Sequence, residues 1–294
     1  MSTEEINNTN LKLVECPRDA MQGLKHFIPT DLKVEYINKL ICCGFDTLDM
    51  GSFVSPRMIP QLKDTSIVLD KIMPSPNTKL LTIVANVQGV KAAVEYDNIQ
   101  CLGYPFSISE TFQKRNINKS IDASMILLDR IYSIAENKNK EVVLYLSMGF
   151  GNPYGDMWSE EFVEDWVHRL DINFSPSVIA ISDTIGCANP VQVKRLFKNL
   201  KASFNSIEFG AHLHVLPNNV KALAEAAFSG GCRRFDSVIK GFGGCPMAKD
   251  DLTGNMPTEL LLKWIKAQGI NHSVNNDAFT DALAFSAQVF KSNN

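Results

Sequence analysis

The chain has 294 residues, 45% of them hydrophobic, which suits one large core and a single domain over residues 11–294 after a flexible N-terminus at 1–10. Its 29 basic and 32 acidic residues are mixed along the chain, giving a formal net charge of -3 and no basic stripe for nucleic acid. No apolar run reaches the roughly 20 residues that span a bilayer, and the polar start is unlike a targeting signal, so we expect a cytoplasmic protein without a membrane partner.

Short apolar segments alternate with amphipathic stretches along the whole chain. This alternation is typical of repeated βα units and a parallel sheet. We expect eight strands, in chain order Lys12–Pro17, Thr47–Phe53, Leu80–Val87, Ile99–Phe106, Glu141–Ser147, Val178–Asp183, Ser206–His214 and Arg233–Ile239.

Helical periodicity separates these strands. In the first helical stretch Leu32, Tyr36 and Leu40 recur at four-residue spacing, which places them on one face. The eighth unit ends with a helix over Thr258–Ala267, and Asn275–Phe290 forms an extra terminal helix. Eight units in a row favour a closed (β/α)₈ TIM barrel with an extra C-terminal helix, and an open doubly wound sheet remains the alternative.

Seven cysteines are scattered along the chain, and no two form a Cys-x-x-Cys pair of the kind that zinc and redox sites use. Their odd number and spacing indicate reduced thiols, most of them small core residues. Cys42 and Cys43 fall on a core-facing helix, so we expect both to react slowly with alkylating reagents.

Two of the five histidines, His212 and His214, stand two residues apart at the end of the seventh predicted strand. Alternation along a strand points both imidazoles to one face, which in a barrel is the mouth where the βα loops begin. This spacing favours a metal site over two structural histidines. Asp19 after the first strand and Asn255 after the eighth would add oxygen ligands suited to Mg²⁺ or Mn²⁺. Taken alone, Asp19 could equally be a helix cap and Asn255 a turn residue.

Arg18 adjoins Asp19, and a guanidinium at a barrel mouth can stabilise a developing enolate, although a surface salt bridge is the alternative. Asp49 ends the second strand and could hold Arg18 in place or handle a proton. Three glycines around Phe242 precede Cys245 and predict a mobile loop that delivers a thiol to the site. A phosphate-binding loop is the other reading, but the segment lacks the Gly-Lys-Ser/Thr ending of a P-loop.

Five segments in chain order carry a resemblance to a known family. They are Val14–Gln22 (VECPRDAMQ), Ser52–Pro56 (SFVSP), Asp183–Gly186 (DTIG), the pair His212 and His214, and Gly243–Pro246 (GGCP). Together they resemble the 3-hydroxy-3-methylglutaryl-CoA lyases and cover nearly the whole chain. The SFVSP and GGCP segments resemble these lyases specifically, within a superfamily that also contains isopropylmalate, homocitrate and citramalate synthases.

The resemblance implies a metal-dependent lyase that cleaves 3-hydroxy-3-methylglutaryl-CoA, or a close 3-hydroxyacyl-CoA, to acetyl-CoA and acetoacetate, a reaction of leucine degradation and ketone-body formation. It also implies an acyl-CoA substrate, a Mg²⁺ or Mn²⁺ cofactor and a homodimer. The residues that it assigns are Asp19, His212, His214 and Asn255 as metal ligands, Arg18 as enolate stabiliser and substrate contact, Cys245 as lid thiol, Asp49, Asp183 and Tyr145 as active-site residues, and Gln22 as a substrate-binding residue.

Four departures from the family pattern lie beside the site. Asp49 stands where the family has glutamate, and the glycine usually found between Cys16 and Pro17 is missing. His214 is followed by Val215 instead of aspartate, and the stretch from Cys245 to Asn255 is one residue longer than usual. The alternatives are a Claisen-type synthase, which usually carries a further C-terminal regulatory domain, and a barrel that has lost catalysis.

Overall fold

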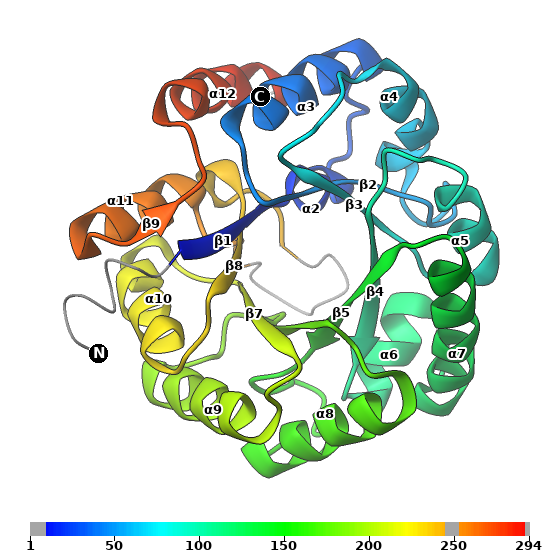
Figure 1. Cartoon of the computed structure of the whole chain (residues 1–294), viewed down its shortest axis with the longest axis vertical. Coiled ribbons are helices and arrows are strands. Elements are labelled where there is room, and N and C mark those ends of the chain that lie inside the picture. Colours follow the sequence, from blue (N-terminus) through cyan, green and yellow to red (C-terminus); the bar gives the residue numbers. More distant parts are fainter. Residues whose placement is uncertain (1–9, 245–252, 292–294) are drawn as a thin grey trace.

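The computed structural model describes residues 10–244 and 253–291 as a closed parallel barrel surrounded by helices (Figure 1). The strands are paired in chain order from β2 to β8, and β1 closes the ring by pairing with both β8 and β2. Their bounds are β1 Asn10–Glu15, β2 Thr47–Ser52, β3 Lys79–Ile83, β4 Cys101–Ser107, β5 Glu141–Ser147, β6 Val178–Asp183, β7 Glu208–Leu213 and β8 Arg234–Ser237. A short strand β9, Asn271–His272, pairs with the start of β1 outside the ring.

The helices form the outer layer of the barrel (Figure 1). Their bounds are α2 Pro17–Gln22, α3 Thr30–Cys43, α4 Thr65–Lys71, α5 Val87–Ala93, α6 Glu110–Ile117, α7 Ile121–Asn137, α8 Glu160–Phe174, α9 Pro190–Ser203, α10 Val220–Ser229, α11 Thr258–Gln268 and α12 Asn276–Val289, with 3₁₀ turns η1 Pro60–Leu62, η2 Pro217–Asn219 and η3 Ile239–Gly241. Among the described residues, no helix is long and apolar enough to cross a membrane.

The structure confirms the eight predicted strands, the closed barrel and the extra C-terminal helix. The first strand was predicted too long, because it ends at Glu15 and Pro17 already occupies the first position of helix α2. Proline suits that position, since its fixed φ is helical and its missing N–H has no partner to lose. Ser159 caps α8 by accepting a hydrogen bond from the Phe162 N–H at 3.1 Å.

The main core lies between the barrel and its helices, and a smaller core fills the barrel interior. Interior residues alternate along each strand with residues that face the helices, as parallel strands covered on both sides require. The interior cluster consists of Leu81, Ile83, Cys101, Val143, Tyr145, Val178 and Ala180.

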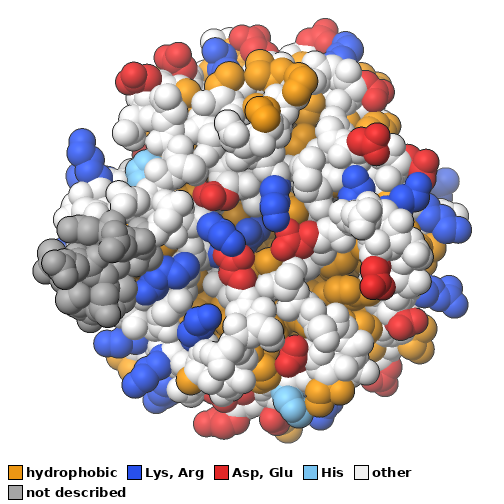
Figure 2. Space-filling view, in the orientation of Figure 1, with side chains coloured by type: hydrophobic (Ala, Val, Ile, Leu, Met, Phe, Trp, Pro, Cys, Tyr) orange, Lys and Arg blue, Asp and Glu red, His pale blue; other side chains and the backbone are white. Residues whose placement is uncertain are grey.

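Ion pairs occupy the end of the barrel where the strands begin. Lys12 Nζ lies 2.8 Å from Glu208 Oε2, and Lys79 Nζ lies 2.7 Å from Glu141 Oε2. Figure 2 shows basic and acidic side chains side by side over the middle of the molecule. These charged residues line a hollow of about 410 Å³ at this end of the barrel. In a TIM barrel the chemistry takes place at the opposite end, where the strands finish.

Glu15 links β1 to the loops that follow β8. Its buried carboxylate accepts hydrogen bonds from the Ile239 N–H at 2.8 Å and the Thr258 hydroxyl at 2.6 Å. Burial, with a smaller contribution from repulsion by Glu259, raises the pKa of Glu15 to about 8 against the two hydrogen bonds that lower it. The carboxyl is therefore a buried group whose charge state changes near neutral pH.

Candidate active site

Helix α2 brings three polar side chains to the mouth of the barrel. Asp19 follows the first strand, as expected, and lies within this helix, whose first turn includes a hydrogen bond from the Asp19 N–H to the Cys16 carbonyl at 3.0 Å. Helical spacing places Arg18 and Gln22 on one face, where Arg18 Nη1 donates to Gln22 Oε1 at 2.9 Å. The Gln22 amide in turn donates to Asp19 Oδ1, which orients that carboxylate.

Strand β7 and the residue that follows it supply the two histidines. One ring nitrogen each from His212 and His214 and one carboxylate oxygen from Asp19 lie within 4.8 Å of one another. His212 Nε2 is 3.7 Å from Asp19 Oδ2, the oxygen that Gln22 leaves free. Atoms that share one ion at about 2.0–2.2 Å each lie roughly this far apart, so the cluster fits a single divalent cation.

Asn255 lies against this cluster. It forms an antiparallel bridge with His214 and hydrogen bonds to Asp19, while its amide nitrogen donates to the Phe242 carbonyl at 3.0 Å. The four residues assigned as ligands are thus brought together from α2, β7 and the segment before α11. A carboxylate, an amide and two imidazoles form a donor set that suits Mg²⁺ or Mn²⁺.

The charge states of Asp19 and His214 suit metal binding, whereas the pKa of His212 is raised, because burial, which lowers it, is outweighed by the hydrogen bond and the attraction to Asp236. Burial opposes ionisation of Asp19, but Arg18 and the two histidines outweigh it, so the pKa of Asp19 is lowered. Burial, and then the neighbouring His212, lower the pKa of His214 to about 4. An ionised carboxylate and a neutral imidazole are the forms that bind a cation.

Asp236 on β8 is a residue that the sequence analysis missed. Its Oδ2 lies 3.1 Å from His212 Nδ1, and with the proton on Nδ1 the other ring nitrogen is directed at Asp19. Such a carboxylate partner fixes the tautomer and orientation of a ligating histidine. The period-2 pattern of the predicted eighth strand could have shown that Asp236 shares the interior face with Arg234.

Arg18 is held by Asp49 from the neighbouring strand β2. Arg18 Nη2 and Nε lie 2.5 and 3.0 Å from Asp49 Oδ2, and the Asp49 side chain has no exposed surface. Burial raises the pKa of Asp49 to about 6, although attraction and hydrogen bonding to the Arg18 guanidinium oppose the rise. Asp49 is therefore mostly ionised at neutral pH. Asp49 and Asp19 together raise the pKa of Arg18 despite its burial, so the guanidinium remains charged.

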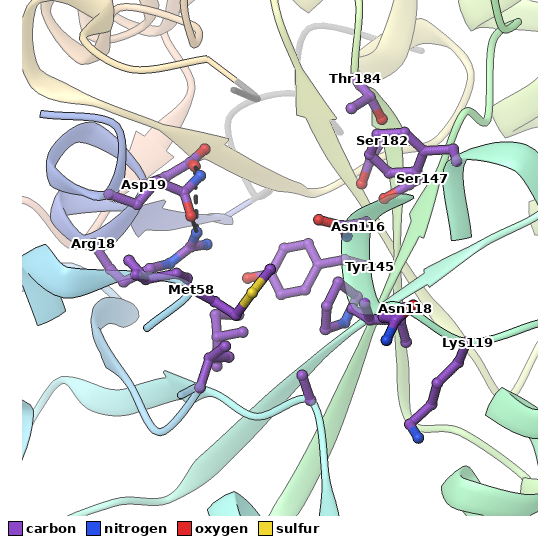
Figure 3. Close-up of a pocket in the computed structure, with 18 of the residues that line it drawn as sticks. Arg18, Asp19, Met58, Asn116, Asn118, Lys119, Tyr145, Ser147, Ser182 and Thr184 are labelled. Atoms are coloured by element: carbon purple, nitrogen blue, oxygen red, sulfur yellow. Dashed lines mark hydrogen bonds and ion pairs between the residues drawn. The ribbon is translucent and has the colours of Figure 1, made fainter. Parts of the chain in front are cut away.

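A cavity of about 420 Å³ opens over this cluster (Figure 3). Arg18, Asp19, Gln22, His212 and His214 border it on one side, and Tyr145 lies in its wall. The Tyr145 ring meets His212 edge to face at 5.5 Å, and its buried hydroxyl has no hydrogen-bond partner in the described part of the chain. Its hydrogen-bonding capacity is therefore unused within the described residues.

Comparison with known proteins identifies the family. The family model described as HMGL-like matches residues 11–285. The chain belongs to the HMGL-like family. It is 32% identical to the cytoplasmic 3-hydroxy-3-methylglutaryl-CoA lyase of Rattus norvegicus, covering 90% of this chain and 76% of that protein. It is also 32% identical to hydroxymethylglutaryl-CoA lyase of Bacillus subtilis, covering 88% of this chain and 85% of that protein.

Solved HMG-CoA lyases share the fold. The Bacillus subtilis enzyme superposes with a TM-score of 0.89 at 30% identity, covering 95% of this chain and 93% of that one. An HMG-CoA lyase from Acinetobacter baumannii, solved with coenzyme A and 3-methylmalate, gives a TM-score of 0.87 at 30% identity, covering 95% and 91%.

Other residues of this HMGL-like chain line the cavity without having been predicted. They are Ser147, Ser182, Thr184, Asn116, Asn118 and Lys119. Asp183, in contrast, is not part of the cavity lining; its carboxylate accepts hydrogen bonds from the Cys187 and Ala188 N–H groups at 3.0 and 2.8 Å. Alternation along β6 explains this, because Ser182 faces the interior and Asp183 faces the following loop.

The predicted lid is only partly described. Gly241, Gly243 and Gly244 have positive φ, which favours glycine at each position, but Cys245 lies outside the described residues. The prediction for Cys42 was wrong, since its side chain is exposed on the outer surface of α3 while Cys43 is buried.

Proposed function

We propose that this chain is a divalent-metal-dependent lyase that cleaves 3-hydroxy-3-methylglutaryl-CoA, or a close 3-hydroxyacyl-CoA, to acetyl-CoA and acetoacetate. Its HMGL-like relatives are named for this activity, and one of them was solved with coenzyme A. The observation that carries the proposal is the convergence of Asp19, His212 and His214 beside a buried, fully paired arginine at one cavity wall.

Asp19, His212, His214 and Asn255 would hold the ion. Bound there, Mg²⁺ or Mn²⁺ supplies a Lewis acid that makes the 3-hydroxyl of the substrate more acidic and orients the bond that breaks. The protein's part is to keep these donors in one orientation, which it does through Gln22 on Asp19 and Asp236 on His212.

Arg18 stabilises the product enolate. When the 3-hydroxyl proton passes to a base in the cavity, the C2–C3 bond breaks. C3 becomes a ketone, and the bonding pair stays on the acetyl-CoA fragment, whose charge rests on the thioester oxygen. Arg18 lies on the cavity wall beside Asp19, and its contact with Asp49 fixes the guanidinium before the charge develops. A donor already in place needs no reorganisation during the reaction.

Two further groups complete the chemistry. The unpartnered Tyr145 hydroxyl hydrogen bonds to the substrate across the cavity. Cys245 is the candidate thiol that protonates the enolate when the glycine loop closes, a role proposed from the Gly243–Pro246 segment.

A cleavage assay on a small panel of 3-hydroxyacyl-CoA thioesters, with and without Mn²⁺, tests the proposal. Acetoacetate and acetyl-CoA should appear in equal amounts from 3-hydroxy-3-methylglutaryl-CoA, and chelation of the metal should stop the reaction. Tight metal binding without cleavage of any member of the panel would contradict the function. A protein that binds no divalent ion would instead be a barrel that has lost catalysis.

A further inference from the structure

The hollow at the end of the barrel where the strands begin, called here the strand-start hollow, is separate from the active site. Four of the residues that line it, Lys79, Glu141, Glu208 and Arg234, are each the first residue of their strand. Its volume of about 410 Å³ is enough for a small molecule. Apart from Pro76, every described residue that lines it has a polar or charged side chain. In the described part of the chain, no residue lines both this hollow and the active-site cavity.

Most of the charge around the strand-start hollow is already paired. Its two lysines form ion pairs of 2.8 Å with Glu208 and 2.7 Å with Glu141. The third carboxylate in the lining, that of Asp46, accepts the Leu13 N–H at 2.9 Å. Arg234 is the third cation in the lining, and it forms no ion pair within residues 10–244 and 253–291. One positive charge in this hollow is therefore left without a direct partner.

Arg234 also has unused hydrogen-bond donors. Its side chain belongs to a residue that is 5% exposed, and its Nε and Nη2 have no hydrogen-bond partner among the described residues. Arg18 uses the same two nitrogens to hold Asp49, at 3.0 and 2.5 Å. Burial lowers the pKa of Arg234, but attraction to Asp236 and other neighbours outweighs it, so the group stays charged. A buried cation with two free donors is costly unless an acceptor is supplied.

The surroundings of Arg234 leave it room to reach a ligand. Gly210 lies opposite it in the pairing of β7 with β8, and a Cβ there would come within 3.1 Å of Arg234 Cδ. The glycine therefore makes space for the arginine side chain. Because no protein acceptor holds Nε and Nη2, turning the guanidinium toward the hollow breaks no hydrogen bond. The buried Thr78 hydroxyl lines the same hollow and is likewise without a partner in the described ranges.

We propose that the strand-start hollow binds a small monocarboxylate, whose two oxygens accept parallel hydrogen bonds from Arg234. This edge of a guanidinium matches the geometry of a carboxylate. A single negative charge balances the one unpaired cation, whereas a phosphate dianion would bring a second charge close to Asp46, Glu141 and Glu208. The polar lining, which includes the Thr78 hydroxyl, suits a short hydroxy acid better than an unsubstituted fatty acid.

An NMR titration of metal-free protein with 3-hydroxybutyrate tests the site, since without the ion a hydroxy acid has no metal to chelate at the opposite end of the barrel. Arg234→Met should weaken binding about 10–100-fold. Arg234→Lys, which keeps the charge and loses the paired donors, should weaken it about three- to tenfold. Arg233→Met is the matched control: its guanidinium donates to the Phe228 carbonyl at 2.8 Å and does not line this hollow, so its affinity should equal that of the wild type.

Butyrate and inorganic phosphate are the comparison ligands, and both should bind more weakly than 3-hydroxybutyrate. Thermal unfolding checks that each variant is folded, and Arg234→Lys carries the comparison if Arg234→Met is not. The proposal is refuted if the wild type binds no carboxylate, if both Arg234 variants keep its affinity, or if Arg233→Met loses as much. Tighter binding of phosphate refutes it too. Since no thioester is cleaved in this titration, its outcome is independent of the lyase assignment.

Discussion

The contact between Arg18 and Asp49 makes a quantitative prediction for Asp49→Glu. Asp49 has no exposed surface, and Arg18 Nη2 already lies 2.5 Å from its Oδ2. One added methylene lengthens the side chain by ~1.5 Å, so either the carboxylate pushes the guanidinium toward the cavity or the strand moves. Overpacking of this kind costs about 1–3 kcal/mol of stability. A displacement of ~1 Å at a group that stabilises the enolate lowers kcat on the order of 100-fold.

Steady-state kinetics on 3-hydroxy-3-methylglutaryl-CoA and thermal unfolding measure the two effects separately. Asp46→Glu is the matched control, since it makes the same change at the opposite end of the barrel, where the Asp46 carboxylate accepts the Leu13 N–H at 2.9 Å; it should leave kcat unchanged. Asp49→Asn keeps the volume but removes the charge, so it should lower kcat without overpacking. A kcat for Asp49→Glu well above wild type would refute the reasoning and indicate a site that has drifted from glutamate.

Three further predictions concern the ligands, the thiols and pH. His212→Ala should lower Mn²⁺ affinity and turnover about 10–100-fold and leave the circular dichroism spectrum unchanged. Normal Mn²⁺ binding by this variant would disprove the ligand assignment. Cys42 should be alkylated quickly whether or not substrate is bound, and Cys43, whose pKa burial raises to about 12, should be alkylated slowly. Cys245 should be alkylated quickly, and bound substrate should protect it. Mass spectrometry of the labelled peptides measures this, and labelling of Cys245 that substrate does not change would contradict the lid assignment. Glu15 retains its proton in the folded chain up to about pH 8 but loses it near 4.5 in the unfolded chain, so its contribution to stability falls as the pH rises between these values. The free energy of unfolding of Glu15→Gln, measured by urea titration, should therefore rise on the order of 1–3 kcal/mol relative to that of the wild type between pH 5 and 8.5.

The periodicity of the sequence predicted most of the fold because each strand is short, apolar and separated from the next by a helical pattern. The bounds of β5 and β6 were predicted to the residue. The error at β1 has a local cause: Cys16 and Pro17 continue the apolar run, but proline starts a helix there. The short strand β9 was missed because its two residues pair with β1 across a long separation in sequence, which no local pattern encodes.

Site residues could be predicted where their spacing within one strand or helix fixes the relative positions of their side chains. They could not be predicted where the positions depend on the register between two strands. His212 and His214 follow from the alternation within one strand. Asp236 depends on β7 and β8 being paired with His212 opposite it, and this register appears only in the folded sheet. Asp183 was assigned from the resemblance and not from strand alternation, and Ser182 is the residue of this pair that lines the cavity.

The charges around the proposed ion lead to a last prediction, on stability. Asp19, Asp49 and Asp236 are buried acidic residues; Arg18 pairs with Asp19 and Asp49, and the buried Arg234 lies close enough to Asp236 for their charges to attract. With neutral histidines these five side chains carry one negative charge in excess, which a divalent cation more than offsets. Buried charge without a counterion is costly, so metal binding should stabilise the fold by RT ln(1 + [M]/Kd), about 2.7 kcal/mol at a hundredfold excess over Kd. Thermal unfolding with Mn²⁺, with chelator and with chelator plus excess Mn²⁺ measures this, and His212→Ala should lose most of the shift. An equal melting temperature in all three conditions would mean that the excess charge is neutralised by protons and not by a metal.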